Sequence, residues 1–487
     1  MTMKKILVYI LALLIAVPAV AQIKKSYKRG VGENAFNHAP EIESLAPGVT
    51  WTYNWSPNPS RYVASQLRPG GIMEFVPMCW NGGFDEQALR DSLTKYPGTK
   101  YLLGFNEPNF KAQSNMTPTQ AAERWPALES IASDYGLQLV APALNFPDGP
   151  INDSVTYQPK EWLTQFIAAY KKLYGKEPRM DYVALHSYMN SHTAMMNFVD
   201  DFAKTFGKKV WLTEFCSWEG TVDSISQLNA MVQKVQDLEL DTMVYRYAWF
   251  KAKGSAEAPY YRLLINPNLF THLPAYGTLS QLGQVYVNMS SYDTTYYHQA
   301  GTEIAAKDWV NSKGPSLEVN TDSQSDQKIQ ISSFDVNNWA EYLIDVPKAG
   351  TYNFDFRLAS EEFLYSPKFR IFVNDEQVGE QVLTATGSTS TWKTQTMQAT
   401  LPAGKVRIRI VSGQSTNCKF NWFKFTSADA PSGDINADGV VNVTDVTALG
   451  NKILGTASYA DSICDLNSDG IINVSDVTTL VNLILNK

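Results

Sequence analysis

Residues 103–108 read LGFNEP, an apolar stretch that runs into Glu107 and stops at a proline. Residues 210–215 read VWLTEF and place Glu214 in the same way, after a run rich in leucine and β-branched residues. Short apolar runs bounded by turn-forming residues predict buried strands. A carboxylate where such a strand stops lies at the rim of a sheet, so the two stretches together predict a site with two carboxylates.

The two stretches are the fourth and the seventh of a series of strand-like runs that alternate with helical stretches. The runs cover residues 28–32, 49–54, 73–79, 101–106, 137–141, 182–186, 209–213 and 243–248. Eight β/α alternations within about 260 residues are typical of a (β/α)8 TIM barrel. Because all strands of such a barrel end on one face, Glu107 and Glu214 are expected at the same mouth.

Two carboxyl groups that face each other across one bond suit the hydrolysis of glycosides. One group gives a proton to the leaving oxygen, and the other attacks the sugar or activates water. A separation of about 5 Å indicates a retaining mechanism, and roughly 6.5 to 9.5 Å an inverting one. For either glutamate alone, a structural ion pair at the end of a strand is the alternative interpretation.

Together with DYVALHSY at residues 181–188, the two stretches resemble glycoside hydrolase family 128 of clan A, the Asl1-like hydrolases. The resemblance implies a catalytic domain at residues 22–290 that cleaves β-1,3-glucan by double displacement, without a cofactor. By position it makes Glu107 the acid/base and Glu214 the nucleophile. Two alternatives stay open: a clan A hydrolase of another β-glucan, and a non-catalytic scaffold that binds glycans.

Further side chains are expected around the glutamate pair. By the resemblance, Asn106 contacts the 2-hydroxyl of the sugar at the reaction centre. The strand-end positions of His186 and Tyr188 suggest sugar contacts or orientation of Glu214. Tryptophans follow four of the strands and are expected to line the cleft and stack on glucose rings; they are Trp55, Trp80, Trp218 and Trp249, with Trp80 and Trp249 favoured.

The helical period vanishes after residue 290, and short alternating runs replace it. They lie at residues 340–346, 352–358, 369–373, 394–401, 406–411 and 420–425, and predict a jelly-roll-like β-sandwich at residues 291–426. The stretches WAEY at 339–342 and NWF at 421–423 resemble carbohydrate-binding module family 6. The resemblance implies a sugar site made by Phe334, Trp392 and Asn421. A sandwich that merely spaces or stabilises the enzyme is the alternative.

An internal repeat follows a linker at residues 427–433. DINADGVVNVTD at 434–445 recurs as DLNSDGIINVSD at 465–476. Oxygen ligands at loop positions 1, 3, 5, 9 and 12, a glycine at 6 and a carbonyl at 7 form a calcium loop. The repeat therefore predicts two Ca²⁺ ions, held by Asp434, Asn436, Asp438, Val440, Asn442 and Asp445, and by Asp465, Asn467, Asp469, Ile471, Asn473 and Asp476.

An aspartate at position 12 and a single helix after each loop make residues 434–487 resemble a type I dockerin. Dockerins bind cohesin domains through those helices, so the resemblance implies a cohesin as a possible partner.

The net charge and the N-terminal sequence limit the expected partners and the expected location of the protein. The 487 residues carry a net charge of −7 without a basic stripe, which argues against a nucleic-acid partner. Residues 1–21 combine two lysines, an apolar stretch and an AVA cleavage site, which predicts a signal peptide. Since no cysteine follows to accept a lipid and no later segment approaches the length of a membrane span, a secreted or periplasmic product is expected.

Overall fold

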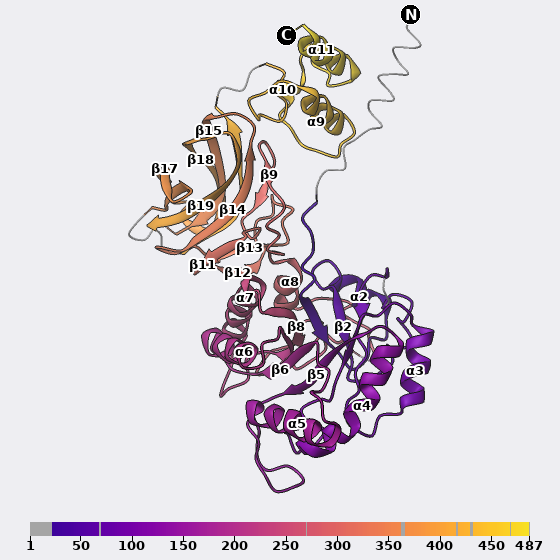
Figure 1. Ribbon diagram of the computed structural model, residues 1–487. Helices are drawn as coiled ribbons and strands as arrows, with labels where there is room; N and C mark the ends of the chain where they lie inside the picture. Colours follow the sequence, from indigo (N-terminus) through magenta and orange to yellow (C-terminus); the bar gives the residue numbers. More distant parts are fainter. Residues whose placement is uncertain are drawn as a thin grey trace, which may run out of the picture. The chain divides into compact units, whose positions relative to one another are not determined.

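The computed structural model describes residues 22–67, 70–268, 270–361, 366–414, 417–428, 432–467 and 469–486. The predicted signal peptide at residues 1–21 lies outside these ranges. The chain divides into two compact units, one from Lys25 to Ser291 and the other made by residues 22–24 together with the chain from Tyr292 onward (Figure 1). Among the described residues, no helix is both long enough and apolar enough to cross a membrane.

The first unit is a parallel barrel with strand order β3-β2-β1-β8-β7-β6-β5-β4. A parallel bridge between Met78 and Leu103 joins the two ends of this series and closes the barrel. The strands are β1 (Arg29–Gly32), β2 (Trp51–Tyr53), β3 (Glu74–Phe75), β4 (Tyr101–Leu103), β5 (Gln138–Leu144), β6 (Tyr182–Ser187), β7 (Val210–Phe215) and β8 (Val244–Phe250). Each coincides with one of the runs read from the sequence, so the predicted (β/α)8 barrel is confirmed.

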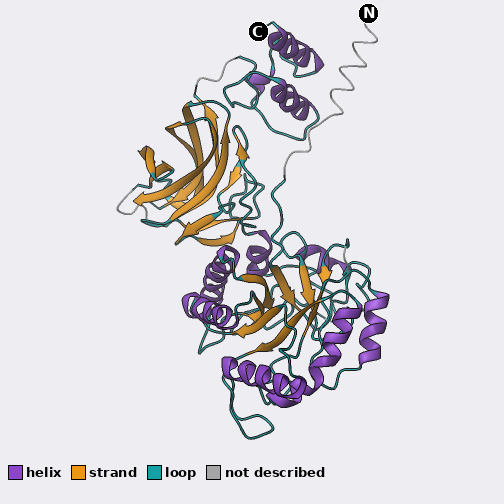
Figure 2. Ribbon diagram, viewed as in Figure 1, coloured by secondary structure: helices purple, strands orange, loops and turns teal. Residues whose placement is uncertain are grey.

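Helices surround the sheet (Figure 2). They are α2 (Ala39–Leu45), α3 (Glu86–Lys95), α4 (Pro118–Asp134), α5 (Pro159–Tyr174), α6 (His192–Phe206), α7 (Ser224–Leu240) and α8 (Gln281–Asn288). Local sequence explains where they begin: the Thr117 side chain accepts a hydrogen bond from the Gln120 N–H, and Pro118 opens α4. Inside the barrel, Trp51, Tyr101 and Trp211 pack face to edge and fill the core.

The second unit contains the predicted β-sandwich. One sheet runs β12-β13-β20-β15-β18, with β10 paired to β20; the other runs β11-β14-β19-β16-β17, with β9 paired to β14. The strands are β9 (His298–Gln299), β10 (Ile304–Ala305), β11 (Asn311–Lys313), β12 (Ser316–Val319), β13 (Ile329–Ser333), β14 (Trp339–Val346), β15 (Gly350–Ser360), β16 (Lys368–Val373), β17 (Glu376–Val382), β18 (Ser388–Leu401), β19 (Gly404–Gln414) and β20 (Cys418–Ser427).

The C-terminal part is helical, as predicted. It consists of α9 (Val443–Ile453), α10 (Asp461–Cys464) and α11 (Val474–Leu485). A small apolar core that includes Ile435, Leu449 and Leu480 joins the two halves of the repeat.

Candidate active site

Glu107 lies just beyond β4, in a segment whose backbone still forms hydrogen bonds to β5. The Glu107 N–H donates to the Ala143 carbonyl at 2.8 Å, and the Gly104 N–H donates to the Val140 carbonyl at 3.0 Å. Gly104 allows this approach, because a Cβ there would lie 2.8 Å from the Val140 oxygen. Glu107 itself has a φ of 44°, a left-handed conformation that side chains other than glycine rarely adopt. Strained backbone of this kind concentrates at functional sites.

Glu214 reaches the barrel mouth through a bulge in β7. Leu185 pairs with Leu212, but His186 pairs with Glu214, so Thr213 is an extra residue. Trp211 faces the barrel interior. Strict alternation would place Glu214 on the opposite side, and the extra residue returns it to the interior side together with His186.

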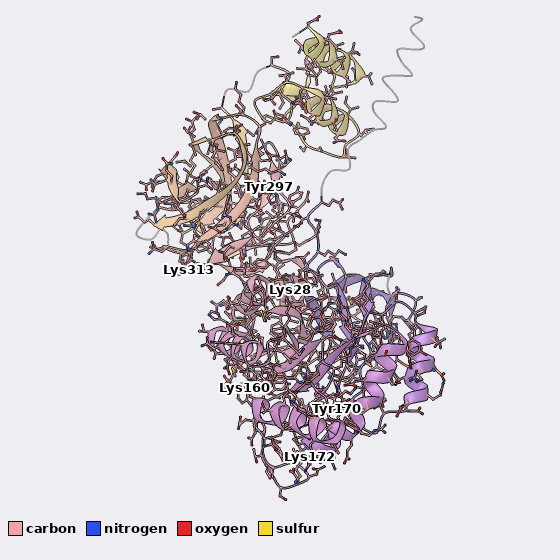
Figure 3. The ribbon with its side chains drawn as sticks, viewed as in Figure 1. Lys28, Lys160, Tyr170, Lys172, Tyr297 and Lys313 are labelled. Carbon is pink, nitrogen blue, oxygen red and sulfur yellow. The ribbon has the colours of Figure 1, made fainter. Side chains whose placement is uncertain are left out.

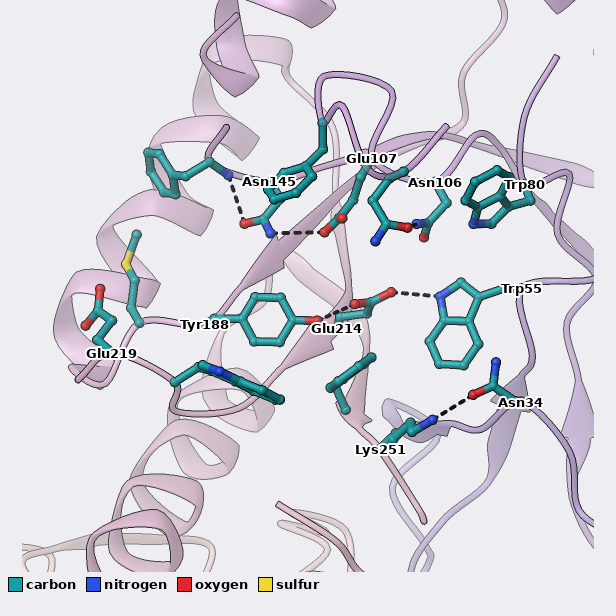
Figure 4. Close-up of a pocket in the computed structure, with 16 residues that line it drawn as sticks. Asn34, Trp55, Trp80, Asn106, Glu107, Asn145, Tyr188, Glu214, Glu219 and Lys251 are labelled. Carbon is teal, nitrogen blue, oxygen red and sulfur yellow. Dashed lines mark hydrogen bonds between the residues drawn. The ribbon is translucent and has the colours of Figure 1, made fainter. Parts of the chain in front are cut away.

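Three donors hold the Glu214 carboxylate. Tyr53 Oη donates to Oε1 at 3.1 Å. Figure 4 shows the other two donors: Trp55 Nε1 donates to Oε1 at 2.8 Å, and Tyr188 Oη donates to Oε2. The residue is 4 % exposed. Hydrogen bonds to a carboxylate favour its ionised form, so these contacts prepare Glu214 to act as an anion.

Glu107 is held on one oxygen only. His186 Nδ1 donates to Oε1 at 2.6 Å, and Asn145 Nδ2 donates to the same atom at 3.0 Å. Within the described part of the chain, Oε2 has no hydrogen-bond partner, although the residue lines the cleft (Figure 4). This oxygen is therefore free to exchange a proton with a bound molecule.

His186 lies between the two carboxylates and couples them. One oxygen of Glu107, one of Glu214 and a His186 ring nitrogen all lie within 4.8 Å of one another. Burial raises the pKa of Glu214, and the Glu107 charge adds to this, although His186 and the Tyr188 and Trp55 hydrogen bonds oppose it. Burial alone lowers the pKa of His186, but the charges of Glu214 and Glu107 reverse this and raise it. The cluster thus retains a proton more strongly than the isolated side chains would.

A cleft of about 680 Å³ opens over the pair. Trp55, Trp80, Asn106, Tyr188 and Trp218 line it, as expected from the sequence. Asn106 contributes to this lining, although its Oδ1 is buried and has no partner among the described residues. The remaining lining residues are Asn34, Glu107, Phe110, Gln113, Asn145, Phe146, Met189, Glu214, Glu219, Phe250 and Lys251.

Two expected sugar contacts are corrected by the geometry. Trp249 is fully buried, packs on Phe215 and Tyr286, and donates from Nε1 to the Tyr261 carbonyl at 2.7 Å. Side chains alternate along β8, so the cleft receives Phe250 instead. His186 is also fully buried and off the cleft lining, so of its two expected roles only the orientation of carboxylates is available, with Glu107 as its closer partner.

Sequence reasoning missed Tyr53 and Asn145, each of which bonds one of the glutamates. Asn145 directly follows β5, so it carried the same signal as the glutamates, a polar residue where an apolar strand stops. Tyr53 read as an ordinary core residue of its strand, and nothing in the sequence distinguished its hydroxyl.

The sugar site expected on the sandwich does not form from the expected residues. Phe334 is fully buried and packs on Phe369 and Phe420. Asn421 is fully buried too, and Ser325, Asn320 and Gln330 engage both ends of its amide at 2.7, 2.8 and 3.2 Å. Trp392 is half-buried on β18. Neither Phe334 nor Asn421 has a surface that a sugar can reach.

The repeated loops have the backbone geometry of calcium loops. In the first, the Asp434 carboxylate accepts from the N–H groups of Asp438 and Gly439 at 3.0 and 2.7 Å. In the second, Asp465 accepts from Asp469 and Gly470 at 3.1 and 3.0 Å. Gly439 and Gly470 have φ angles of 91° and 81°, which position 6 requires.

The oxygen donors of the loops suit a hard cation. Asp445 and Asp476 close the loops through backbone N–H groups, and Asn442 and Asn473 at position 9 also cap α9 and α11. Position 9 often binds calcium through water. Carboxylate, amide and carbonyl oxygens are the ligands that Ca²⁺ prefers, so these residues fit the ion.

Comparison with known proteins gives three family matches. Residues 30–286 match the glycosyl hydrolase catalytic core family, residues 305–427 match carbohydrate binding module family 6, and residues 432–485 match the dockerin type I domain.

Individual relatives match the barrel part of the chain. Two solved structures are family 128 (subgroup II) endo-β-1,3-glucanases. The one from Pseudomonas viridiflava is 36% identical, with 54% of this chain and 98% of that chain covered and a TM-score of 0.48. The one from Sorangium cellulosum is 31% identical, with 53% and 97% covered and a TM-score of 0.45.

A curated relative is alkali-sensitive linkage protein 1 of Schizosaccharomyces pombe, 25% identical over 252 residues, which are 50% of this chain. The match spans 40% of the length of that relative.

Proposed function

Because the chain belongs to the glycosyl hydrolase catalytic core family and is therefore an enzyme, we propose that it cleaves β-1,3-glucan with retention of configuration. Glu107 is the acid/base and Glu214 the nucleophile. In the first step Glu214 attacks the anomeric carbon while Glu107 protonates the leaving oxygen. In the second step Glu107 takes a proton from water, and that water releases the sugar from Glu214.

The observation that carries this proposal is the unequal environment of two close carboxylates. One oxygen of Glu107 and one of Glu214 lie within 4.8 Å of each other, and such a short separation favours a retaining enzyme over an inverting one. Three donors occupy Glu214, as a nucleophilic carboxylate requires, whereas Oε2 of Glu107 has no partner within the described residues. The hydrogen bonds to Glu214 favour the ionised carboxylate that a nucleophile needs, and the open oxygen of Glu107 leaves a place for the transferred proton.

The substrate rests on sequence likeness and on the chemistry of the cleft. The two bacterial proteins that are 36% and 31% identical over nearly their whole length bear the name endo-β-1,3-glucanase. Trp55, Trp80 and Trp218 offer flat faces to sugar rings, and Asn106 adds a polar side chain to the lining. A neutral polysaccharide fits such a lining.

The decisive test is a digest of laminarin followed by NMR in the first minutes of reaction. We expect β-1,3-linked oligosaccharides whose new reducing ends start as the β-anomer and then mutarotate. An initial α-anomer would refute the double displacement. If the enzyme hydrolyses only β-1,4 or mixed-linkage glucan in a parallel panel, the substrate assignment changes to that glucan. Binding without hydrolysis of any glucan would favour a non-catalytic scaffold.

The other two modules attach this enzyme to its surroundings, the sandwich to carbohydrate and the docking module to a partner protein. We place the sandwich at residues 291–426, the linker at 427–433 and the docking module at 434–487, behind a signal peptide at 1–21 and the catalytic domain at 22–290. A family 6 module binds carbohydrate and a type I dockerin domain typically binds a cohesin, which is the pattern of secreted polysaccharide-degrading enzymes. The sugar site of the sandwich uses residues other than Phe334 and Asn421.

Calcium removal should loosen the docking module and spare the barrel. With two Ca²⁺ ions bound, the loops stay closed; without them, repulsion among each loop's aspartates opens the module. We expect EDTA to speed proteolysis within residues 434–486 at least about tenfold, because cleavage follows local opening. Ca²⁺ should restore protection and Mg²⁺ should not, with laminarin hydrolysis unchanged throughout. A cleavage rate independent of calcium would contradict the assignment.

A further inference from the structure

A lysine lies fully buried behind the cleft, on α7. Lys234 is 0 % exposed, and its Nζ donates to the Met189 carbonyl at 2.6 Å and to Ser217 Oγ at 2.9 Å. Within the described ranges, no carboxylate lies at ion-pair distance from it. A buried ammonium without a bonded anion is unusual, because desolvation of the charge is left largely uncompensated.

A buried glutamine accompanies it two turns earlier on the same face of the helix. Gln227 is 0 % exposed; its Oε1 accepts from the Ser217 N–H at 3.0 Å. Its Nε2 donates to the carbonyls of Ser217 and Pro259 at 3.0 and 2.6 Å. Gln227 therefore holds both backbone groups of Ser217, while Lys234 holds its hydroxyl.

The groups that these side chains hold stand next to cleft residues. Met189 follows Tyr188, one of the three donors to Glu214, and Ser217 precedes Trp218. The two loops are tied together directly, since the Trp218 N–H donates to the Tyr188 carbonyl at 3.0 Å. A shift of the α7 contacts would thus move a donor of Glu214 and one wall of the cleft.

The burial of Lys234 disfavours its charged form. Burial lowers its pKa to about 8, and the nearby Cys216 and Glu219 only partly oppose this. A lysine whose pKa is lower in the folded than in the unfolded state destabilises the folded state at any pH below both pKa values. For Lys234 this destabilisation decreases as the pH rises above about 8. An apolar side chain of similar length would avoid the cost of burying this charge, so packing alone does not account for a lysine at this position.

We infer that Lys234 and Gln227 form a clamp that positions the loops after β6 and β7, and through them Tyr188 and Trp218, for the reaction. This role rests on the proposed glucanase function. Lys234 and Gln227 touch no substrate, so they are positioning residues. Misplacement by about an ångström far from the reacting atoms can slow an enzyme about a hundredfold.

The test is Lys234→Met, which keeps the apolar stem and removes the donors. We expect kcat on laminarin to fall about 10- to 100-fold, because Tyr188 no longer orients Glu214 well, with KM changing only a few-fold. The melting temperature at pH 7 should stay within a few degrees of the wild-type value. Ser217→Ala, which removes one of the two acceptors, should give a smaller fall in the same direction.

Lys172→Met is the matched control, because Lys172 is an exposed lysine on α5 (Figure 3). It should change neither kcat nor melting temperature. Hydrogen exchange gives a readout independent of activity: the amide of Trp218 should exchange faster in Lys234→Met and Ser217→Ala than in the wild type. Unchanged exchange and kinetics would overturn the clamp, as would a loss of activity that merely follows the unfolded fraction. If the wild type fails to hydrolyse β-1,3-glucan, the proposed function falls, and the exchange data still decide the clamp.

Discussion

Replacement of Glu214 by glutamine is expected to lower kcat on β-1,3-glucan by at least about 10⁴-fold, as loss of a catalytic nucleophile does in other enzymes. The amide cannot form the glycosyl ester. Its volume matches that of the carboxylate, and its oxygen can still accept from Tyr188 or from Trp55. The fold should therefore survive, and circular dichroism together with steady-state kinetics on laminarin checks both expectations.

Glu219→Gln is the control for Glu214→Gln, because Glu219 also lines the cleft but lies away from the pair (Figure 4). It should keep kcat within a few-fold of the wild type. A Glu214→Gln variant that hydrolyses laminarin at the wild-type rate would eliminate Glu214 as the nucleophile.

Replacement of Glu107 by alanine is expected to lower kcat on laminarin about 10³-fold, the usual contribution of a general acid and base. An aryl β-laminaribioside with a good leaving group needs no protonation, so its first step should remain fast and the glycosyl-enzyme should accumulate. Added azide then attacks the anomeric carbon without a base and displaces Glu214. The expected product is the β-glycosyl azide, identified by NMR.

The pH profile gives a second readout for Glu107. Activity needs an ionised Glu214 and one retained proton in the cluster, so a bell-shaped profile is expected. Burial raises the pKa of Glu214 above its ordinary 4.5, and activity should fall as pH drops through that raised value. The alkaline limb should disappear in Glu107→Ala when the aryl substrate is used. Equal losses on both substrates, without azide rescue, would rule out the acid/base role.

Much of the molecule follows from local sequence. The barrel could be predicted because each strand is a short apolar run and each helix has its own start signal, as at Thr117. The calcium loops could be predicted because their ligands come from consecutive positions of a single loop. The glycoside hydrolase, carbohydrate-binding and dockerin resemblances, which rest on such contiguous motifs, are confirmed by the family matches.

The side chains around the pair were less predictable, because their direction depends on the register between strands. The choice between Trp249 and Phe250 follows from alternation on β8, and the bulge at Thr213 reverses that alternation within β7. A bulge arises from the pairing of β6 with β7, so β7 alone contains no sign of it. The same reason explains Phe334 and Asn421, whose burial depends on strands distant in the sequence.

Two features of the site follow from the amino-acid sequence alone: a carboxylate ends the fourth strand and another ends the seventh, and both lie on one face of the barrel. Parallel strands make this unavoidable once their number and order are known. The difference between the two carboxylates depends on tertiary contacts. Three donors from β2, its following loop and the loop after β6 bond Glu214, while His186 and Asn145 leave one oxygen of Glu107 open. Those partners come from separate strands, and only the closed barrel brings them within hydrogen-bond distance.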